Sequence, residues 1–88
     1  MQTCQEHFAR TVQPVFPSEA LRDGLSGYVV VTYDLDGSGK AQNVQVVVAH
    51  PAGVFNAVAM EALRRSEFKQ GVSVSGCRYV ADFAVVRR

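Results

Sequence analysis

Residues 28–48 read YVVVTYDLDGSGKAQNVQVVV, and most of this segment alternates with a period of two. Residues 28–35 are rich in β-branched and aromatic side chains, which is typical of a β-strand. Residues 36–40, DGSGK, supply glycines where a tight turn needs a positive φ angle, and a second strand follows over residues 44–48. The sequence therefore predicts a β-hairpin. The side chains expected to face the core are Val29, Val31, Tyr33 and Leu35 of the first strand and Val44, Val46 and Val48 of the second.

The segment after the hairpin is predicted to form a helix and then a third strand. Residues 50–53, HPAG, interrupt the second strand, and residues 54–65 carry apolar side chains that recur every 3.6 residues. Alternation returns from Cys77 to Val86, where we expect the third strand. The apolar side of the helix is formed by Val54, Phe55, Val58, Ala59, Ala62 and Leu63.

The chain before the hairpin divides at residue 12. Residues 1–12 form an N-terminal extension, and the apolar spacing in residues 3–12 indicates a short helix. Residues 13–17, QPVFP, are held extended by two prolines. Ser18 stands at an N-cap position, and a short helix is predicted over residues 19–25. Its buried side is expected to consist of Ala20, Leu21 and Leu25.

These elements predict an α+β fold with a single domain over residues 13–88. Their order is helix, strand, strand, helix, strand, and both helices are expected on one face of a three-stranded antiparallel sheet. We expect the strand order 2-1-3, with the third strand antiparallel to the first and at an edge. The other face of the sheet is then left without a helix, and its side chains are Tyr28, Val30, Thr32, Val47 and Val80.

Composition excludes several classes of protein. The chain has 88 residues and a mass of 9.6 kDa, which is enough for one domain. Nine Lys and Arg residues stand against eight Asp and Glu residues, and this balance argues against nucleic acid or an anionic membrane as the partner. No apolar run approaches the ~20 residues of a membrane helix, and the first residues lack the apolar core of a signal peptide. We therefore expect any membrane anchor or export signal to lie outside this sequence.

No cluster of residues predicts a catalytic, cofactor or metal site. GSGK at residues 37–40 precedes a strand and not a helix, so it does not match a phosphate-binding P-loop. Asp34, Asp36 and Ser38 resemble the start of a calcium loop, but Gln45 stands where the bidentate glutamate is needed. The two histidines are far apart, and the carboxylates form no acid–base pair. A small hydrolase would need a deep pocket with convergent polar groups, for which we find no pattern.

Cys4 and Cys77 leave two interpretations open. A disulfide between them would tie the N-terminal segment to the start of the last strand, and closing so long a loop would stabilise the fold by about 4 kcal/mol. The alternative is two separate thiols. We favour the bridge in an oxidising compartment and the thiols in the cytosol.

The last strand is a candidate binding edge. No proline interrupts Cys77 to Val86, so every backbone N–H there is available, and an extended peptide could add to this edge as a further strand. The alternative is that Arg78 and Asp82 protect the edge, or that the N-terminal segment covers it.

The ordered set of motifs resembles the C-terminal domain of TonB-type energy transducers. The resemblance lies in residues 13–47, QPVFPSEALRDGLSGYVVVTYDLDGSGKAQNVQVV, and in residues 50–65, HPAGVFNAVAMEALRR. It covers the Gln-Pro-x-Phe-Pro segment, the Gly- and Val-rich strand, the Asp-Gly turn and the helix that ends in two arginines. Where family members commonly have Trp and a proline, this chain has Ser66, Glu67 and Phe68, and we expect Phe68 to take the aromatic place.

The resemblance implies a non-enzymatic, periplasmic protein that works without a cofactor. In the family this domain is tethered by a Pro-rich linker to an inner-membrane helix and an ExbB–ExbD-type motor. It captures the TonB box of outer-membrane transporters, as in siderophore or iron uptake, on its last strand. Carried over to this sequence, the partner-binding residues are Gln13, Pro14, Arg78, Tyr79, Val80, Ala81, Asp82 and Phe83.

A second interpretation is a TolA-like or stand-alone envelope domain. Such a domain would bind another periplasmic protein through the bare sheet face, or form a homodimer through Tyr28, Val30 and Val47.

Overall fold

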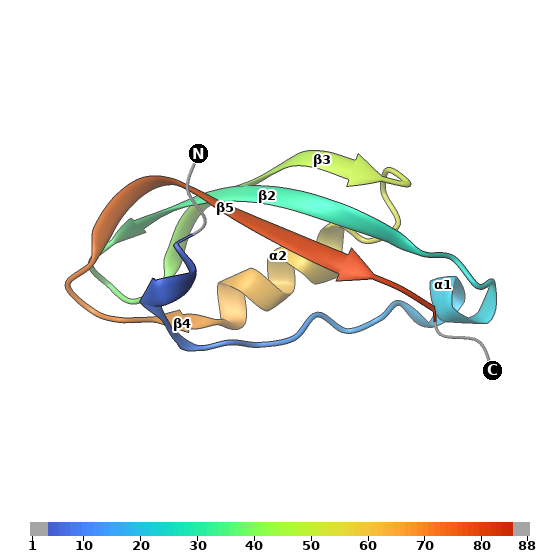
Figure 1. The fold of residues 1–88 in the computed structure, drawn as a ribbon, viewed down its shortest axis with the longest axis horizontal. Coiled ribbons are helices and arrows are strands. Elements are labelled where there is room, and N and C mark those ends of the chain that lie inside the picture. Colours follow the sequence, from blue (N-terminus) through green and yellow to red (C-terminus); the bar gives the residue numbers. More distant parts are fainter. Residues whose placement is uncertain (1–3, 86–88) are drawn as a thin grey trace.

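A three-stranded antiparallel sheet forms the centre of the molecule, which is described by a computed structural model over residues 4–85. The strands lie in the order β3-β2-β5 and comprise β2 (Gly27–Asp36), β3 (Ala41–His50) and β5 (Ser73–Phe83) (Figure 1). This arrangement confirms the predicted order 2-1-3, with the last strand antiparallel to the first and at an edge.

The hairpin of β2 and β3 contains a bulge that overturns one core prediction. The four expected side chains of β2 are buried, but on β3 the register shifts, so that Val30 lies opposite Val48 while Val31 lies opposite Val46. Val47 is the extra residue, and a single extra residue reverses the alternation beyond it. Val48 is therefore 45% exposed, and the prediction that it faces the core was wrong.

Helix α2 (Asn56–Arg65) covers one face of the sheet (Figure 1). It begins two residues later than predicted, and Phe55 precedes it as a fully buried residue whose ring stacks on Phe83 at a centroid distance of 4.4 Å. Ala59 and Ala62 are buried as expected, because their small side chains let the helix approach the sheet closely. No helix among residues 4–85 is long and apolar enough to cross a membrane.

Helix α1 (Ser18–Arg22) is shorter and less buried than expected. Ser18 is its first residue and not its N-cap, since Pro17 holds that position without a side-chain hydrogen bond. Ala20 is buried, but Leu21 and Leu25 are 55% and 40% exposed, so their predicted burial was wrong. A helix of barely more than one turn at the end of the sheet presents only one residue to the core.

The N-terminal segment forms a second, small sheet that the sequence did not predict. Instead of a helix over residues 3–12, a single 3₁₀ turn, η1 (Gln5–His7), leads into strand β1 (Phe8–Arg10), while residue 3 lies outside the described part. Strand β1 pairs antiparallel with β4 (Glu67–Phe68). Phe68 is buried with its ring 4.4 Å from that of Phe8, and it takes the aromatic place expected for it.

Strand β5 begins four residues before the predicted start at Cys77 and ends at Phe83. It is extended because it pairs along the whole of β2, from Ser73 opposite Asp36 to Phe83 opposite Gly27. The predicted end at Val86 lies outside the described residues, and Ala84 and Val85 are not in the strand.

Candidate functional site

The outer edge of β5 has no strand partner among residues 4–85. Strand β2 occupies only the other edge, and no described backbone hydrogen bond of a turn, loop or cap reaches residues 73–83. About half of the N–H and C=O groups of a strand paired on one side point away from its partner. Those groups of β5 are available to a further strand.

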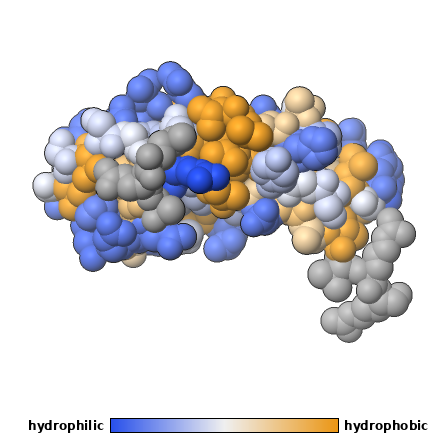
Figure 2. Space-filling view, turned by 45° about the horizontal axis from the view of Figure 1, so that its top comes forward, coloured by the Kyte–Doolittle hydropathy of each residue, from blue (hydrophilic) through white to orange (hydrophobic). Residues whose placement is uncertain are grey.

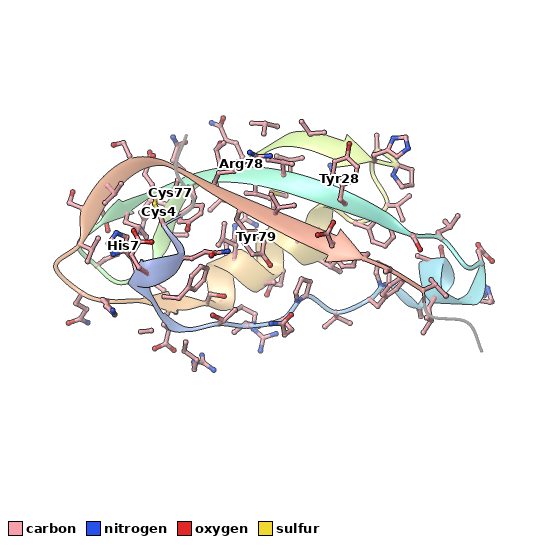
Figure 3. The ribbon with its side chains drawn as sticks, viewed as in Figure 1. Cys4, His7, Tyr28, Cys77, Arg78 and Tyr79 are labelled. Carbon is pink, nitrogen blue, oxygen red and sulfur yellow. A yellow bond between two sulfur atoms is a disulfide. The ribbon has the colours of Figure 1, made fainter. Side chains whose placement is uncertain are left out.

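The side chains along this edge alternate between the two faces of the sheet. Arg78, Val80 and Asp82 are exposed on the outer face. Ala81 and Phe83 are buried towards α2, and Tyr79 on the same face is half-buried. In Figure 3 Arg78 and Tyr79 extend from opposite sides of β5. The six predicted contact residues of β5 are thus contiguous, but only three of them offer exposed side chains.

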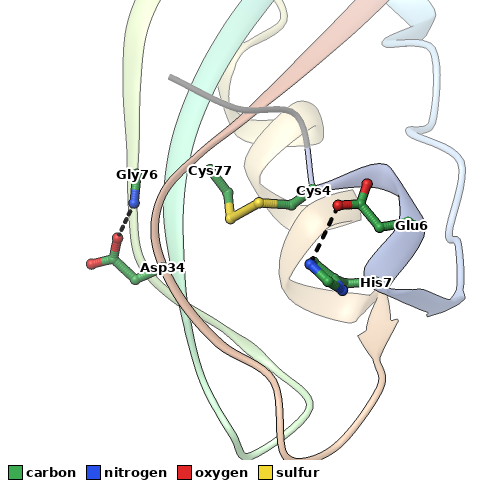
Figure 4. The surroundings of a disulfide bond; sticks show 6 residues. All are labelled: Cys4, Glu6, His7, Asp34, Gly76 and Cys77. Carbon is green, nitrogen blue, oxygen red and sulfur yellow. Dashed lines mark hydrogen bonds and ion pairs between the residues drawn. A yellow bond between two sulfur atoms is a disulfide. The ribbon is translucent and has the colours of Figure 1, made fainter.

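A disulfide joins the N-terminal segment to this strand. Cys4 and Cys77 are bonded with their Cα atoms 5.7 Å apart, and both are buried (Figure 4). Of the two interpretations that the sequence left open, the structure therefore shows the disulfide and not two separate thiols. We call residues 4–11 the N-terminal hook.

The hook turns away from β5 towards β4. Its links to that side are the β1–β4 pairing, a hydrogen bond from the Lys69 N–H to the His7 carbonyl (2.8 Å), and an exposed ion pair of Arg10 with Glu67 (2.8 Å). The hook therefore leaves the edge of β5 unpaired, contrary to the alternative in which the N-terminal segment covers it by strand pairing.

A groove of about 440 Å³ separates the hook from β5. Arg78 is the only charged residue of the six that line it. The hook contributes Gln5, Phe8 and Thr11, and β5 contributes Arg78, Tyr79 and Val80.

Two tyrosines near the groove are held in their protonated form. Burial raises the pKa of Tyr79. Burial, with smaller contributions from the negative charge of Glu6 and from Tyr79, raises the pKa of Tyr33 to about 12. The Tyr33 hydroxyl is also buried without a hydrogen-bond partner among the described residues. At neutral pH both side chains are neutral hydrogen-bonding groups and not bases.

Gln13 and Pro14 are not among the residues that line the groove at β5. They line a separate hollow of about 40 Å³ against α2, together with neighbours such as Val58 and Ala62. Gln13 is exposed and Pro14 is half-buried there. The structure therefore does not bring these two predicted contact residues together with Arg78, Tyr79 and Val80.

The outer face of the sheet carries a second feature, a row of apolar residues. Val30 lies opposite Val48 on one side and opposite Val80 on the other. Figure 2 shows hydrophobic side chains gathered midway along the molecule. The exposed members of this face are Tyr28, Val47, Val48 and Val80.

In the part of the chain that the structure describes, the turn motif has a structural role and the histidines have no identified role. Residues 37–40 form the hairpin turn. Hydrogen bonding from the Ser38 side chain, and next from the Ser38 N–H (3.0 Å to the carboxylate), lowers the pKa of Asp36. His7 lies 3.4 Å from Glu6. No three His, Cys, Asp or Glu side chains between residues 4 and 85 gather into a metal-binding group.

The hook residues Gln5, Phe8 and Thr11 were missed by sequence reasoning. The apolar spacing of their segment indicated a helix, whereas the segment forms the three-residue strand β1, whose pairing partner β4 has only two residues. The usable signal was Cys4, since a bridge to Cys77 places the residues next to Cys4 near the last strand.

Comparison with known proteins agrees with this architecture. The family model described as "Gram-negative bacterial TonB protein C-terminal" matches residues 12–78. The TonB protein of Klebsiella pneumoniae is 32% identical over 72 residues, which cover 82% of this chain and 30% of that protein. TonB of Escherichia coli K12 is 34% identical over 64 residues, or 73% of this chain and 27% of that protein. The chain thus spans less than a third of these relatives.

Solved structures give the same result. The NMR structure of the Pseudomonas aeruginosa TonB C-terminal domain matches 92% of this chain and 87% of that chain with a TM-score of 0.79 at 22% identity, which supports the fold. The TonB2 protein of Vibrio anguillarum matches 85% of this chain and 76% of that chain, with a TM-score of 0.72 at 30% identity. Because the family model matches residues 12–78 and these relatives match most of the chain, the chain belongs to the family of Gram-negative bacterial TonB protein C-terminal domains.

Proposed function

We propose that this domain is a non-enzymatic binding module of the periplasm, which takes up the TonB box of an outer-membrane transporter as a fourth strand along β5. The observation that carries the proposal is the unpaired outer edge of β5 beside an open groove. Membership in the TonB family supports the choice of partner.

Strand addition at this edge divides affinity and selectivity between backbone and side chains. Main-chain hydrogen bonds to β5 supply sequence-independent affinity, while side chains at alternate positions supply selectivity. Arg78, Val80 and Asp82 are exposed next to the edge and provide that selectivity. Buried Ala81 and Phe83 fix the strand against the core, so that the edge is preformed and loses little entropy on binding.

The same geometry suits the transmission of force. A peptide that lies along a strand and is pulled along its length loads several hydrogen bonds at once. Modest affinity is then compatible with a substantial load. The pull would come from an ExbB–ExbD-type motor through a membrane anchor on the N-terminal side, as the family resemblance implies.

The experiment compares proline substitutions at two adjacent positions of β5. Along a strand, successive N–H groups point to opposite edges. Of the two variants Val80→Pro and Ala81→Pro, one therefore removes an N–H donor from the open edge of β5, and the other removes an N–H donor that points to β2. Binding of a synthetic peptide that spans the TonB box of a transporter from the same cell is measured by titration calorimetry. The proline variant that keeps the native far-UV circular dichroism is expected to bind at least tenfold more weakly.

Arg64→Ala is the matched control, because Arg64 is exposed on α2 and does not line the groove. It should leave affinity unchanged. Full affinity in the folded proline variant would contradict strand addition, and chemical-shift changes confined to Tyr28, Val47 and Val48 would indicate binding on the sheet face instead.

A further inference from the structure

We propose that the N-terminal hook is the second wall of a slot that encloses the added strand. In this slot one apolar side chain of the bound peptide packs between Phe8 and Tyr79, and the Cys4–Cys77 disulfide holds the wall in place. The inference rests on the proposed function, since it assigns a specificity pocket to the same edge.

The size of the groove fits a single strand. Three residues of a strand extend about 10 Å along the chain, a strand occupies about 4.8 Å within a sheet, and a sheet with its side chains is about 10 Å thick. The product of these lengths is about 480 Å³. The groove measures about 440 Å³, and its β5 wall is the three-residue stretch Arg78, Tyr79 and Val80.

The alternation of strands assigns the pocket to one position of the peptide. A peptide residue that faces Tyr79 directs its side chain to the same face as Tyr79, and the residues before and after it project to the outer face with Arg78 and Val80. On the Tyr79 face the side chain meets Phe8, which is fixed by its contact with Phe68 at a centroid distance of 4.4 Å. Two aromatic walls favour an aromatic or branched aliphatic side chain.

The disulfide is the covalent bond that keeps the wall next to β5. The hook's described hydrogen bonds and ion pair to distant parts of the chain go to the β4 side, at Glu67, Phe68 and Lys69. Without the bond to Cys77, nothing among these contacts holds Gln5 beside Arg78. The hook lies before residue 12, where the family match begins, and Tyr79 and Val80 lie after residue 78, where it ends.

The test is an alanine scan of the same TonB-box peptide against two proteins, followed by amide chemical shifts and calorimetry. With the oxidised wild type, one peptide position is expected to lose about tenfold in affinity when changed to Ala, and the amides of Gln5, Phe8 and Thr11 are expected to shift with those of β5. With Cys4→Ala/Cys77→Ala the loss at that position should fall to twofold or less.

A second variant covers the outcome in which removal of the disulfide unfolds the domain. Gln5→Trp narrows the slot without touching the bond, and it should weaken the parent peptide about tenfold while changing the affinity of the alanine-substituted peptide by less than threefold. This inference would be overturned if the alanine scan of the peptide gave identical results for the bridged protein and for every folded variant, and if amide chemical shifts changed on β5 but not on the hook. Strand addition would remain intact in that case. Absence of any shift on β5 would overturn the proposed function itself.

Discussion

Gly27 begins β2 directly against the backbone carbonyl of His50, the last residue of β3. A Cβ atom at Gly27 would overlap the His50 oxygen and would lie 2.8 Å from both Phe55 Cε2 and Pro51 Cδ. The backbone oxygen cannot move without breaking the β2–β3 register at Tyr28 and His50. We expect Gly27→Ala to lower the free energy of unfolding by about 3 kcal/mol, measured by urea unfolding.

Gly53→Ala is the control for this prediction. Gly53 has a φ of 81°, but a Cβ atom added there would meet no other atom within 4 Å, so only backbone strain of about 1 kcal/mol is expected. Equal losses for the two variants would show that the close contact at Gly27 relaxes without cost.

Ser66 connects the end of α2 to Val12, which follows the N-terminal hook. Its buried hydroxyl donates to the Ala62 carbonyl (2.8 Å) and accepts from the Val12 N–H (3.0 Å). Ser66→Ala should cost about 1–2 kcal/mol in thermal unfolding, because the Val12 N–H loses its partner in a partly buried site. Ser26→Ala removes the acceptor of the Val85 N–H at an exposed site, where water replaces it, and should cost less than about 0.5 kcal/mol.

The central elements could be predicted because their patterns are local. The burial of Val29, Val31 and Tyr33 follows from strict alternation, and α2 follows from its 3.6-residue period, so both are visible within a dozen residues. The edge position of the last strand followed from the order of elements. The absence of proline from residues 77–86 then indicated that this edge could pair with a further strand.

The remaining features depend on contacts between distant residues. The bulge at Val47 arises from the register between two strands, which neither strand's own pattern encodes. Strand β4 has two residues, too few for any period, and its partner lies 57 positions away at the Arg10–Glu67 pair. The groove could not be predicted because its two walls come from opposite ends of the chain.

Loss of the Cys4–Cys77 bond should destabilise the domain substantially. The bond closes a loop with a sequence separation of 73, for which the chain-entropy model gives about 4 kcal/mol. Cys4→Ala/Cys77→Ala is expected to lose that amount in urea unfolding, and reduced wild type should match the variant. A difference below about 1 kcal/mol would contradict the prediction, provided that mass measurement with alkylation confirms the bond in the starting protein.

The bond should also limit how far the chain extends under tension. When the two ends of the oxidised protein are pulled in optical tweezers, the segment between Cys4 and Cys77 stays closed. Reduction releases this segment, and at about 3.4 Å per residue the unfolded length should increase by about 250 Å. The same extension before and after reduction would show that the two cysteines are not bonded to each other.

The raised pKa of Tyr33 predicts how the stability of the domain changes at alkaline pH. Its folded pKa is about 12, mainly because it is buried, whereas an unfolded tyrosine ionises near 10. Between these values the unfolded chain loses the proton while the folded chain retains it, so stability decreases as pH rises, by up to about 1.4 kcal/mol per pH unit from this group. The raised pKa of Tyr79 acts in the same direction.

Tyr33→Phe separates the contribution of this residue from all other titrations. The substitution removes a buried hydroxyl that has no described hydrogen-bond partner, so at pH 7 it should leave stability unchanged or raise it by about 1 kcal/mol. Between pH 10 and 12 the difference in stability between variant and wild type should widen, because only the wild type binds a proton more tightly in the folded state at this position. Urea unfolding of both proteins at pH 8, 10 and 11 measures this difference, and parallel pH profiles would mean that Tyr33 ionises in the folded protein as easily as in the unfolded chain.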